Sequence, residues 1–125
     1  MLVVCGNDQL DEVSLWGSTT VFEVGDNTVR RHTWSAATFG LSECSVNELQ
    51  VGSPPESAAR IRAVFTGERS AARDIIVANA AAALIAANAE TDPLIAAGRA
   101  AAALDSGDTD KLLARFSEWT QSLPT

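Results

Sequence analysis

Residues 2–12 read LVVCGNDQLDE, a short apolar run followed at once by a mostly polar and acidic stretch. Residues 2–5 are all apolar and lack the alternation of apolar and polar residues that marks a strand with one solvent-exposed face. They therefore predict a strand buried on both faces. Residues 6–12 then lie beyond the carboxyl end of that strand, where open α/β sheets bind ligands. This stretch favours an α/β fold with a candidate site in residues 6–12.

A β-hairpin is predicted further along the chain. Residues 20–24 and 28–34 are rich in β-branched and aromatic residues, and residues 25–27 (GDN) between them tolerate positive φ. Arg30 and His32 are expected on one face of the second strand. One buried strand and a hairpin make only a partial sheet. Either the first strand lies alone between the hairpin and the helices, or the chain is the C-terminal piece of a larger α/β domain with further strands.

About four helices are predicted after the hairpin. Ser53, Pro54 and Glu56 have the spacing of a capping box with proline at the first helical position, and Gly67 is placed to end this first helix. The other segments are expected at about 71–87, 93–104 and 110–121, the last of them ended by Pro124. The chain is therefore predicted to form one domain, residues 1–125, with a strand, acidic loop and hairpin region (1–52) and a helical region (53–125).

Length, charge and composition exclude several functional classes. The 125 residues allow one domain, and 46% hydrophobic with 20% charged residues is ordinary for a globular protein. A formal net charge of -7 disfavours nucleic-acid binding. No apolar segment suits a membrane span or a signal peptide, and Cys5 and Cys44 form no CxxC pair, so a cytoplasmic location is expected.

The adjacent carboxylates Asp11 and Glu12 are the candidate metal ligands. They are hard oxygen donors of the kind that Mg²⁺ uses, with water and substrate phosphates completing its octahedron. Acidic loops are also common as plain solvated surface, so the residues alone leave both interpretations open.

Other candidates have an ordinary structural explanation as well as a functional one. His32 could pair with Cys5 as a nucleophile, but a packing or surface histidine is the simpler interpretation. The apolar stripe 112–119 is expected to be core or an oligomer contact. Asn79, a polar residue inside an alanine-rich helix, is expected to bond to a neighbouring backbone.

Several segments of the chain, in the same order and with similar spacing, resemble anthranilate phosphoribosyltransferase. The resemblance is to the C-terminal part of that family's catalytic domain, which has the nucleoside phosphorylase/phosphoribosyltransferase fold. It covers essentially the whole chain. The segments are VVCGNDQLDEVS (3–14), the hairpin, FGL (39–41), GERSAARD (67–74), NAAAAL (79–84) and ALDSG (103–107).

The resemblance implies an activity and a metal. The family joins anthranilate to 5-phosphoribosyl 1-diphosphate in tryptophan biosynthesis, releases diphosphate and uses Mg²⁺, and Asp11 and Glu12 match its magnesium-holding pair. The family usually has glycine in place of Gln9 and commonly histidine in place of Cys5, which bears on the geometry of the loop. No catalytic or substrate-binding residue is assigned in this chain.

The family's Gly-Thr-Gly-Gly-Asp phosphate loop and its N-terminal helical domain have no counterpart in these 125 residues. The chain alone is therefore expected to be inactive. We expect it to bind 5-phosphoribosyl 1-diphosphate and anthranilate productively only when a partner chain or the missing portion completes it. The alternative is a non-catalytic, self-associating interaction module derived from the same fold, which predicts a homo-oligomer without metal dependence. Thymidine-phosphorylase-like chemistry on the related fold is less favoured.

Overall fold

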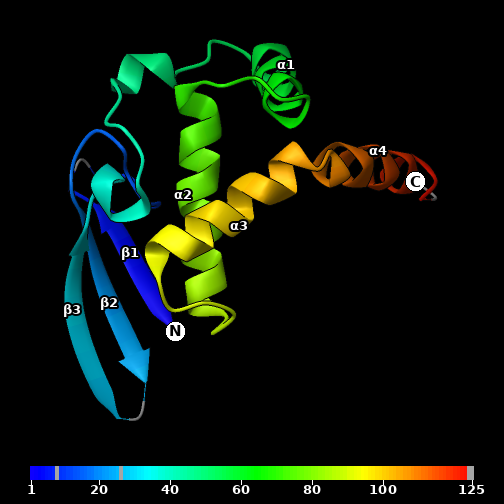
Figure 1. The fold of residues 1–125 in the computed structure, drawn as a ribbon. Coiled ribbons are helices and arrows are strands. Elements are labelled where there is room, and N and C mark those ends of the chain that lie inside the picture. The colour runs from blue at the N-terminus through cyan, green and yellow to red at the C-terminus, as the bar shows by residue number, and fades with distance from the viewer. Residues whose placement is uncertain (8, 26, 124–125) are drawn as a thin grey trace.

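The computed structural model describes residues 1–7, 9–25 and 27–123. Within these ranges a three-stranded sheet is followed by two short 3₁₀ turns and by four helices, the number of helices that the sequence predicted. In Figure 1, α2 stands beside the sheet, α3 crosses α2, and α4 extends away from the body toward the C-terminus. The elements are β1 (Leu2–Gly6), β2 (Thr19–Gly25), β3 (Thr28–Trp34), η1 (Ala36–Phe39), η2 (Val46–Glu48), α1 (Pro54–Phe65), α2 (Ala71–Ala86), α3 (Pro93–Asp105) and α4 (Asp108–Gln121).

β1 is not an isolated strand, because it pairs antiparallel with β2 from Leu2 opposite Glu23 to Gly6 opposite Thr19. The strand order is β1-β2-β3. The expectation that β1 is buried on both faces is wrong in this structure, since Val3 is 49% exposed and Cys5 is also exposed. Only one face of β1 is covered, although its sequence is apolar on both.

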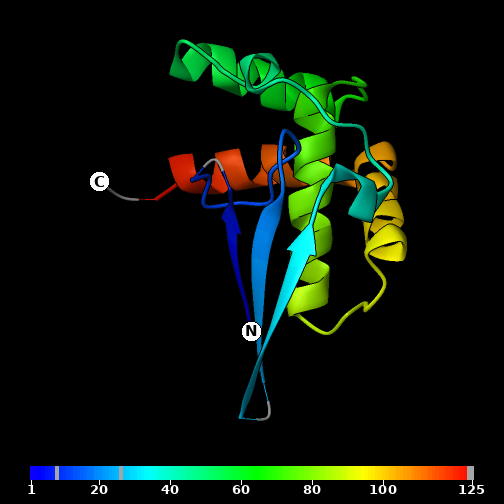
Figure 2. The ribbon, with the colours of Figure 1, turned by 90° about the vertical axis from the view of Figure 1, so that its left-hand side faces the viewer.

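The two faces of the sheet differ sharply in burial. Residues paired across a sheet share a face, and Thr19, Val21 and Trp34 are buried on one face, whereas Arg30 and His32, nearer the hairpin turn on that face, are exposed. The opposite face carries Val3, Phe22 and Val29, all of them exposed. Figure 2 looks onto this outer face and shows β1, β2 and β3 in front of α2. Within the described residues, the sheet is thus covered on one side only.

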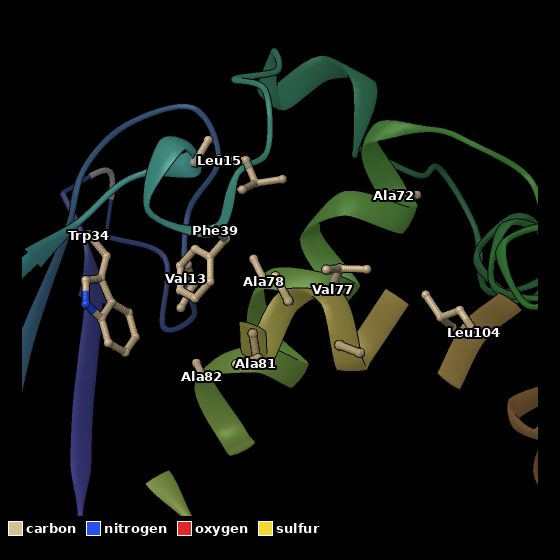
Figure 3. Close-up of a cluster of buried hydrophobic side chains, with 14 of the residues drawn as sticks. Val13, Leu15, Trp34, Phe39, Ala72, Val77, Ala78, Ala81, Ala82 and Leu104 are labelled. Atoms are coloured by element: carbon tan, nitrogen blue, oxygen red, sulfur yellow. The ribbon is translucent and has the colours of Figure 1, made fainter. Parts of the chain in front are cut away.

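The core lies between the inner face of the sheet and α2 (Figure 3). The rings of Trp34 and Phe39 meet edge to face with centroids 5.3 Å apart, the arrangement that aromatic quadrupoles favour. Val13 and Leu15, from the loop between β1 and β2, are fully buried beside them. On the other side of α2 the buried contacts with α3 are mostly alanines, and such small side chains let the two helices approach closely.

The helix ends largely follow the predicted signals. The Ser53 hydroxyl accepts a hydrogen bond from the Glu56 backbone N–H at 3.3 Å, as an N-cap should. The Glu56 carboxylate accepts from the backbone N–H of Gly52 at 2.8 Å, not from Ser53, which corrects the reciprocal half of the predicted capping box. Gly67 has φ +106° just past α1, where glycine is the favoured residue. Asp8, the turn residue Asp26 and the predicted stop Pro124 lie outside the described residues.

Asn79 of α2 anchors the β1–β2 loop. Its Oδ1 accepts from the backbone N–H of Val13 at 2.9 Å, and its Nδ2 donates to the carbonyl of Val13 at 3.2 Å and to that of Ile75 at 3.0 Å. The expectation of a bond to neighbouring backbone is confirmed. Because Val13 is fully buried, Asn79 satisfies two backbone groups that would otherwise have to be desolvated without a partner.

A second polar contact joins the start of α2 to the end of α3. The Arg73 side chain is only 4% exposed and donates to the Asp105 carboxylate at 2.7 Å, while Arg69 reaches the same carboxylate at 3.2 Å. The hydrogen bond from Arg73, followed by the positive charges of Arg73 and Arg69, lowers the pKa of Asp105 below its ordinary value. The ionised form of Asp105 is therefore favoured by folding.

Replacing Asn79 by alanine should lower the free energy of unfolding by about 1–3 kcal/mol, because both backbone groups of Val13 then lose their partner. Urea denaturation of the variant and the wild type measures this difference. The matched control is Asn47→Ala, at an exposed asparagine, which should change stability by less than about 0.5 kcal/mol. Equal effects of the two substitutions would contradict the anchoring role.

Asp105 should make stability pH-dependent. Because its pKa is lower in the folded chain, its contribution is fully present above the unfolded pKa and is lost as the pH falls through the folded value. The Asp105→Asn variant should therefore be less stable than the wild type at pH 7, and the difference in stability between the two proteins should become smaller at acid pH. Thermal unfolding midpoints of both proteins, measured from pH 7 to acid pH, test this prediction. A difference that stays constant with pH would contradict it.

Candidate functional site

The loop between β1 and β2, residues 7–18, carries the candidate metal ligands. Its first turn is closed by hydrogen bonds from the Gly6 N–H to the Leu10 carbonyl at 2.8 Å and from the Gln9 N–H to the Gly6 carbonyl at 2.9 Å. Its two ends are joined by a bond from the Asn7 N–H to the Ser18 carbonyl at 2.9 Å. The loop is therefore held in one conformation by its own backbone.

Side chains add to this closure at the base of the loop. The amide of Asn7 donates to the Ser18 hydroxyl and accepts from that of Thr20. The Thr19 hydroxyl accepts from the buried N–H of Ser14 at 2.9 Å. Asn7 belongs to the stretch 6–12 that the sequence marked as a candidate site, but its pairing with Ser18 and Thr20, eleven and thirteen residues further along, becomes visible only in the structure.

Asp11 and Glu12 lie between two fixed points of the loop. The closed turn 6–10 precedes them, and Val13, held by Asn79, follows directly. Both acidic residues are exposed, and neither carboxylate forms a hydrogen bond or ion pair with the described part of the chain. Four carboxylate oxygens are thus presented to solvent from a constrained backbone.

Gln9 occupies a backbone position that normally favours glycine. Its φ is +72°, in the left-handed region where a Cβ atom costs about 1–2 kcal/mol. The loop therefore adopts this conformation in spite of the glutamine, and its backbone geometry does not require glycine. Cys5, the other departure noted in the sequence, is exposed on the outer face of β1, and its thiol donates to the Gly6 carbonyl at 3.4 Å.

A groove of about 560 Å³ opens beside Glu12. Its walls come from the loop, η2, α1 and α2, and they are mainly apolar. Arg60 is the one cationic residue among the described lining residues, and its guanidinium already donates to the Glu48 carbonyl at 2.6 Å. The other lining residues are Leu10, Trp16, Val46, Leu49, Gln50, Val51, Ser57, Ile61, Val64, Ala72, Ile75 and Ile76.

The donor set of the loop fits a partial magnesium site. Carboxylate oxygens are the ligands that Mg²⁺ prefers, and Asp11 and Glu12 are not committed to other partners within the described ranges. Among the described residues there is no group of three or more His, Cys, Asp or Glu placed to hold a metal ion. Asp11 and Glu12 could therefore supply at most part of a coordination sphere, which water or phosphate oxygens would have to complete.

The structure does not bring Cys5 and His32 together. Cys5 pairs with Thr20, whereas His32 lies opposite Val21, so the two side chains point to opposite faces of the sheet. His32 Nε2 lies 3.0 Å from the Glu23 carboxylate, and Arg30 on the same face lies 3.9 Å from it. The shared face of Arg30 and His32 is confirmed, and a Cys5–His32 nucleophile pair is excluded by this geometry.

Cys44 is the other thiol. Burial, followed by the negative charges of Glu48 and Asp74, raises the pKa of Cys44 above its ordinary value. A raised pKa keeps the thiol protonated near neutral pH, which argues against a nucleophilic role.

The sequence is similar to known enzymes along nearly its whole length. The family model described as "Glycosyl transferase family, a/b domain" matches residues 1–110. The anthranilate phosphoribosyltransferase of Mycobacterium sp. (strain KMS) is 41% identical over 130 residues, which cover 98% of this chain and 36% of that protein. That of Delftia acidovorans is 45% identical over 106 residues, covering 85% of this chain and 31% of that protein.

Solved structures give the same result. Anthranilate phosphoribosyltransferase from Saccharomyces cerevisiae in complex with PRPP and Mg superposes with a TM-score of 0.84 and 25% identity, over 98% of this chain and 35% of that one. The enzyme from Thermus thermophilus superposes with a TM-score of 0.85 and 28% identity, over 97% of this chain and 36% of that one. The predicted fold class, the C-terminal portion of this α/β domain, is thereby confirmed.

The chain spans about a third of the length of the curated relatives that it matches. None of the helices in the described ranges is long and apolar enough to cross a membrane. The match to the family model covers most of the chain, and the relatives share both its sequence and its fold. The chain therefore belongs to the glycosyl transferase family, a/b domain, in which the relatives described above are anthranilate phosphoribosyltransferases.

Proposed function

We propose that the chain is the C-terminal portion of the catalytic domain of an anthranilate phosphoribosyltransferase, which transfers phosphoribosyl from 5-phosphoribosyl 1-diphosphate to anthranilate. The similarity to such enzymes over 98% of the chain is the observation that carries this proposal. Residues 1–125 then form one piece of a larger domain, with the strand, loop and hairpin region at 1–52 and the helical region at 53–125. A cytoplasmic location goes with this function.

The exposed outer face of the sheet supports a larger domain. The residues of β1 are apolar on both faces, but only one face is covered, and Val3, Phe22 and Val29 are exposed together on the other. β1 is also an edge strand whose free side can accept another strand. Both features are expected of a sheet that continues into further strands and is covered by further helices.

Asp11 and Glu12 are proposed as the residues that hold Mg²⁺. The Saccharomyces cerevisiae enzyme has been solved with PRPP and Mg. When bound, Mg²⁺ would neutralise the charge that develops on the leaving diphosphate. The chain's own contribution is to hold the two carboxylates in place: the closed turn 6–10 fixes the loop before them, and Asn79 fixes Val13 after them.

The isolated 125-residue chain is proposed to lack transferase activity. Its residues contain no Gly-Thr-Gly-Gly-Asp phosphate loop, and its described side chains include no further cluster of metal ligands. A second polypeptide that carries the remaining portion would have to supply the other contacts to both substrates.

Titration of the purified chain with 5-phosphoribosyl 1-diphosphate in the presence of Mg²⁺ should give a weak heat of binding that disappears without the metal. Asp11→Ala/Glu12→Ala should weaken this binding roughly tenfold or more, because the metal loses its protein ligands. Isothermal calorimetry measures both.

The matched control is Glu43→Ala/Asp110→Ala, which removes two exposed carboxylates elsewhere and changes the net charge equally. This variant should bind like the wild type. Unchanged binding by the Asp11/Glu12 variant, or a titration of the folded wild type that shows no heat of binding, would contradict the assignment of Asp11 and Glu12 as metal ligands. Circular dichroism of all three proteins ensures that folded chains are compared.

A further inference from the structure

Two features of the chain cost free energy. The stripe 112–119 is one of them, because Leu112, Phe116 and Trp119 are 57–62% exposed. The expectation that this stripe is core is wrong within the described residues, and its role as an oligomer contact stays a prediction. Gln9 is the other, with its backbone at φ +72°, where every residue with a Cβ atom meets a steric cost that glycine avoids. Contacts inside the loop can offset that second cost.

The conformation of Gln9 decides where the candidate metal ligands lie. Asp11 follows it by two residues, and a change of φ at one residue redirects the whole backbone after it. The turn around Gln9 is closed by the bonds from the Gly6 N–H to the Leu10 carbonyl and from the Gln9 N–H to the Gly6 carbonyl. A strained conformation persists only where the surrounding structure holds it from more than one side. The turn therefore needs a second attachment.

Asn7 supplies that attachment at the base of the loop. Its Nδ2 donates to the Ser18 hydroxyl, and its Oδ1 accepts from the Thr20 hydroxyl at 3.3 Å. Its backbone N–H donates to the Ser18 carbonyl at 2.9 Å. Ser18 directly precedes β2 and Thr20 belongs to β2, so Asn7 ties the turn to the sheet.

With both ends of the turn held, Gln9 has little freedom. Asn7 is tied to the start of β2, and Leu10 is tied to Gly6, the last residue of β1. Gln9 lies between these two points, and it could relax to a right-handed conformation only by breaking one of the attachments. The net stabilisation from a hydrogen bond is of the same order as the cost of a left-handed residue, so loss of the Asn7 side chain would open the turn.

We propose that Asn7 is a positioning residue of the metal loop: its side chain holds the left-handed turn at Gln9, which keeps the two carboxylates that follow in place for Mg²⁺. This inference rests on the proposed role of Asp11 and Glu12 as the metal ligands. The Asn7 amide is bonded at the base of the loop, so it acts through the backbone and is not itself a ligand. A glycine at position 9 would remove the strain and make the Asn7 side chain dispensable.

Amide hydrogen exchange of the metal-free chain tests the attachment directly. Asn7→Ala should lower the protection factor of the Gly6 N–H roughly tenfold, because the turn that this N–H closes opens more often. With Gln9→Gly already in place, the same substitution should lower it by less than about threefold. The matched control is Asn47→Ala, at an exposed asparagine outside the loop, which should leave the protection factor unchanged.

Manganese binding tests the consequence for the metal. Mn²⁺ takes the same oxygen ligands as Mg²⁺, and its electron paramagnetic resonance signal reports the free ion. Because apparent affinity falls with the fraction of chains whose loop is closed, Asn7→Ala should weaken Mn²⁺ binding by the full chain roughly threefold. The Asn7→Ala/Gln9→Gly double variant should bind like Gln9→Gly alone. A general loss of structure would not be rescued in this way by a change at another residue.

Two results would overturn the proposal on its own terms. One is a protection factor or an Mn²⁺ affinity that Asn7→Ala leaves unchanged. The other is an equal loss of affinity from Asn7→Ala with glutamine and with glycine at position 9, which would exclude the link to strain.

A third result would overturn the proposal together with the metal assignment. It is Mn²⁺ binding that is the same, or absent, in both the wild type and Asp11→Ala/Glu12→Ala. The exchange measurement, made without metal, would then still show whether Asn7 holds the turn, so the two failures are distinguishable. Circular dichroism of each variant ensures that folded chains are compared.

Discussion

The hydrogen bonds between the Asn79 amide and the backbone of Val13 connect the two halves of the chain. A loop that enters a hydrophobic core brings peptide groups with it, and these must find partners there. Asn79 supplies both a donor and an acceptor from the middle of α2, so the loop can bury Val13 and Leu15 and still leave its acidic residues outside. The position of the candidate site is therefore set by a helix far away in sequence.

Local signals in the sequence predicted the elements well, because they act over a few residues. The β-branched runs defined β2 and β3, and Ser53 and Gly67 marked the ends of α1. The environment of β1 could not be predicted in the same way. Its apolar pattern indicates what the strand can bury, whereas the actual burial depends on which other segments are present to cover it.

The candidate site, too, could be predicted from the sequence only in its local features. Asp11 and Glu12 stand out in the sequence as an acidic pair after a strand, and the resemblance to a family gave them a role. The groove beside Glu12 could not be predicted, because it is assembled from four separate elements. Gln9 illustrates a different limit: the sequence suggests a disturbed loop, but backbone hydrogen bonds around Gly6 and Leu10 maintain the left-handed conformation.

The alanine contact between α2 and α3 has a consequence for how the chain can evolve. An alanine side chain has no rotamers to lose on burial, so this contact forms without that entropic cost. It also leaves no room for adjustment: at Ala81 or Ala96, both fully buried, any larger side chain would push the two helices apart. The surfaces of the chain can drift in sequence, while this junction accepts little except alanine or glycine.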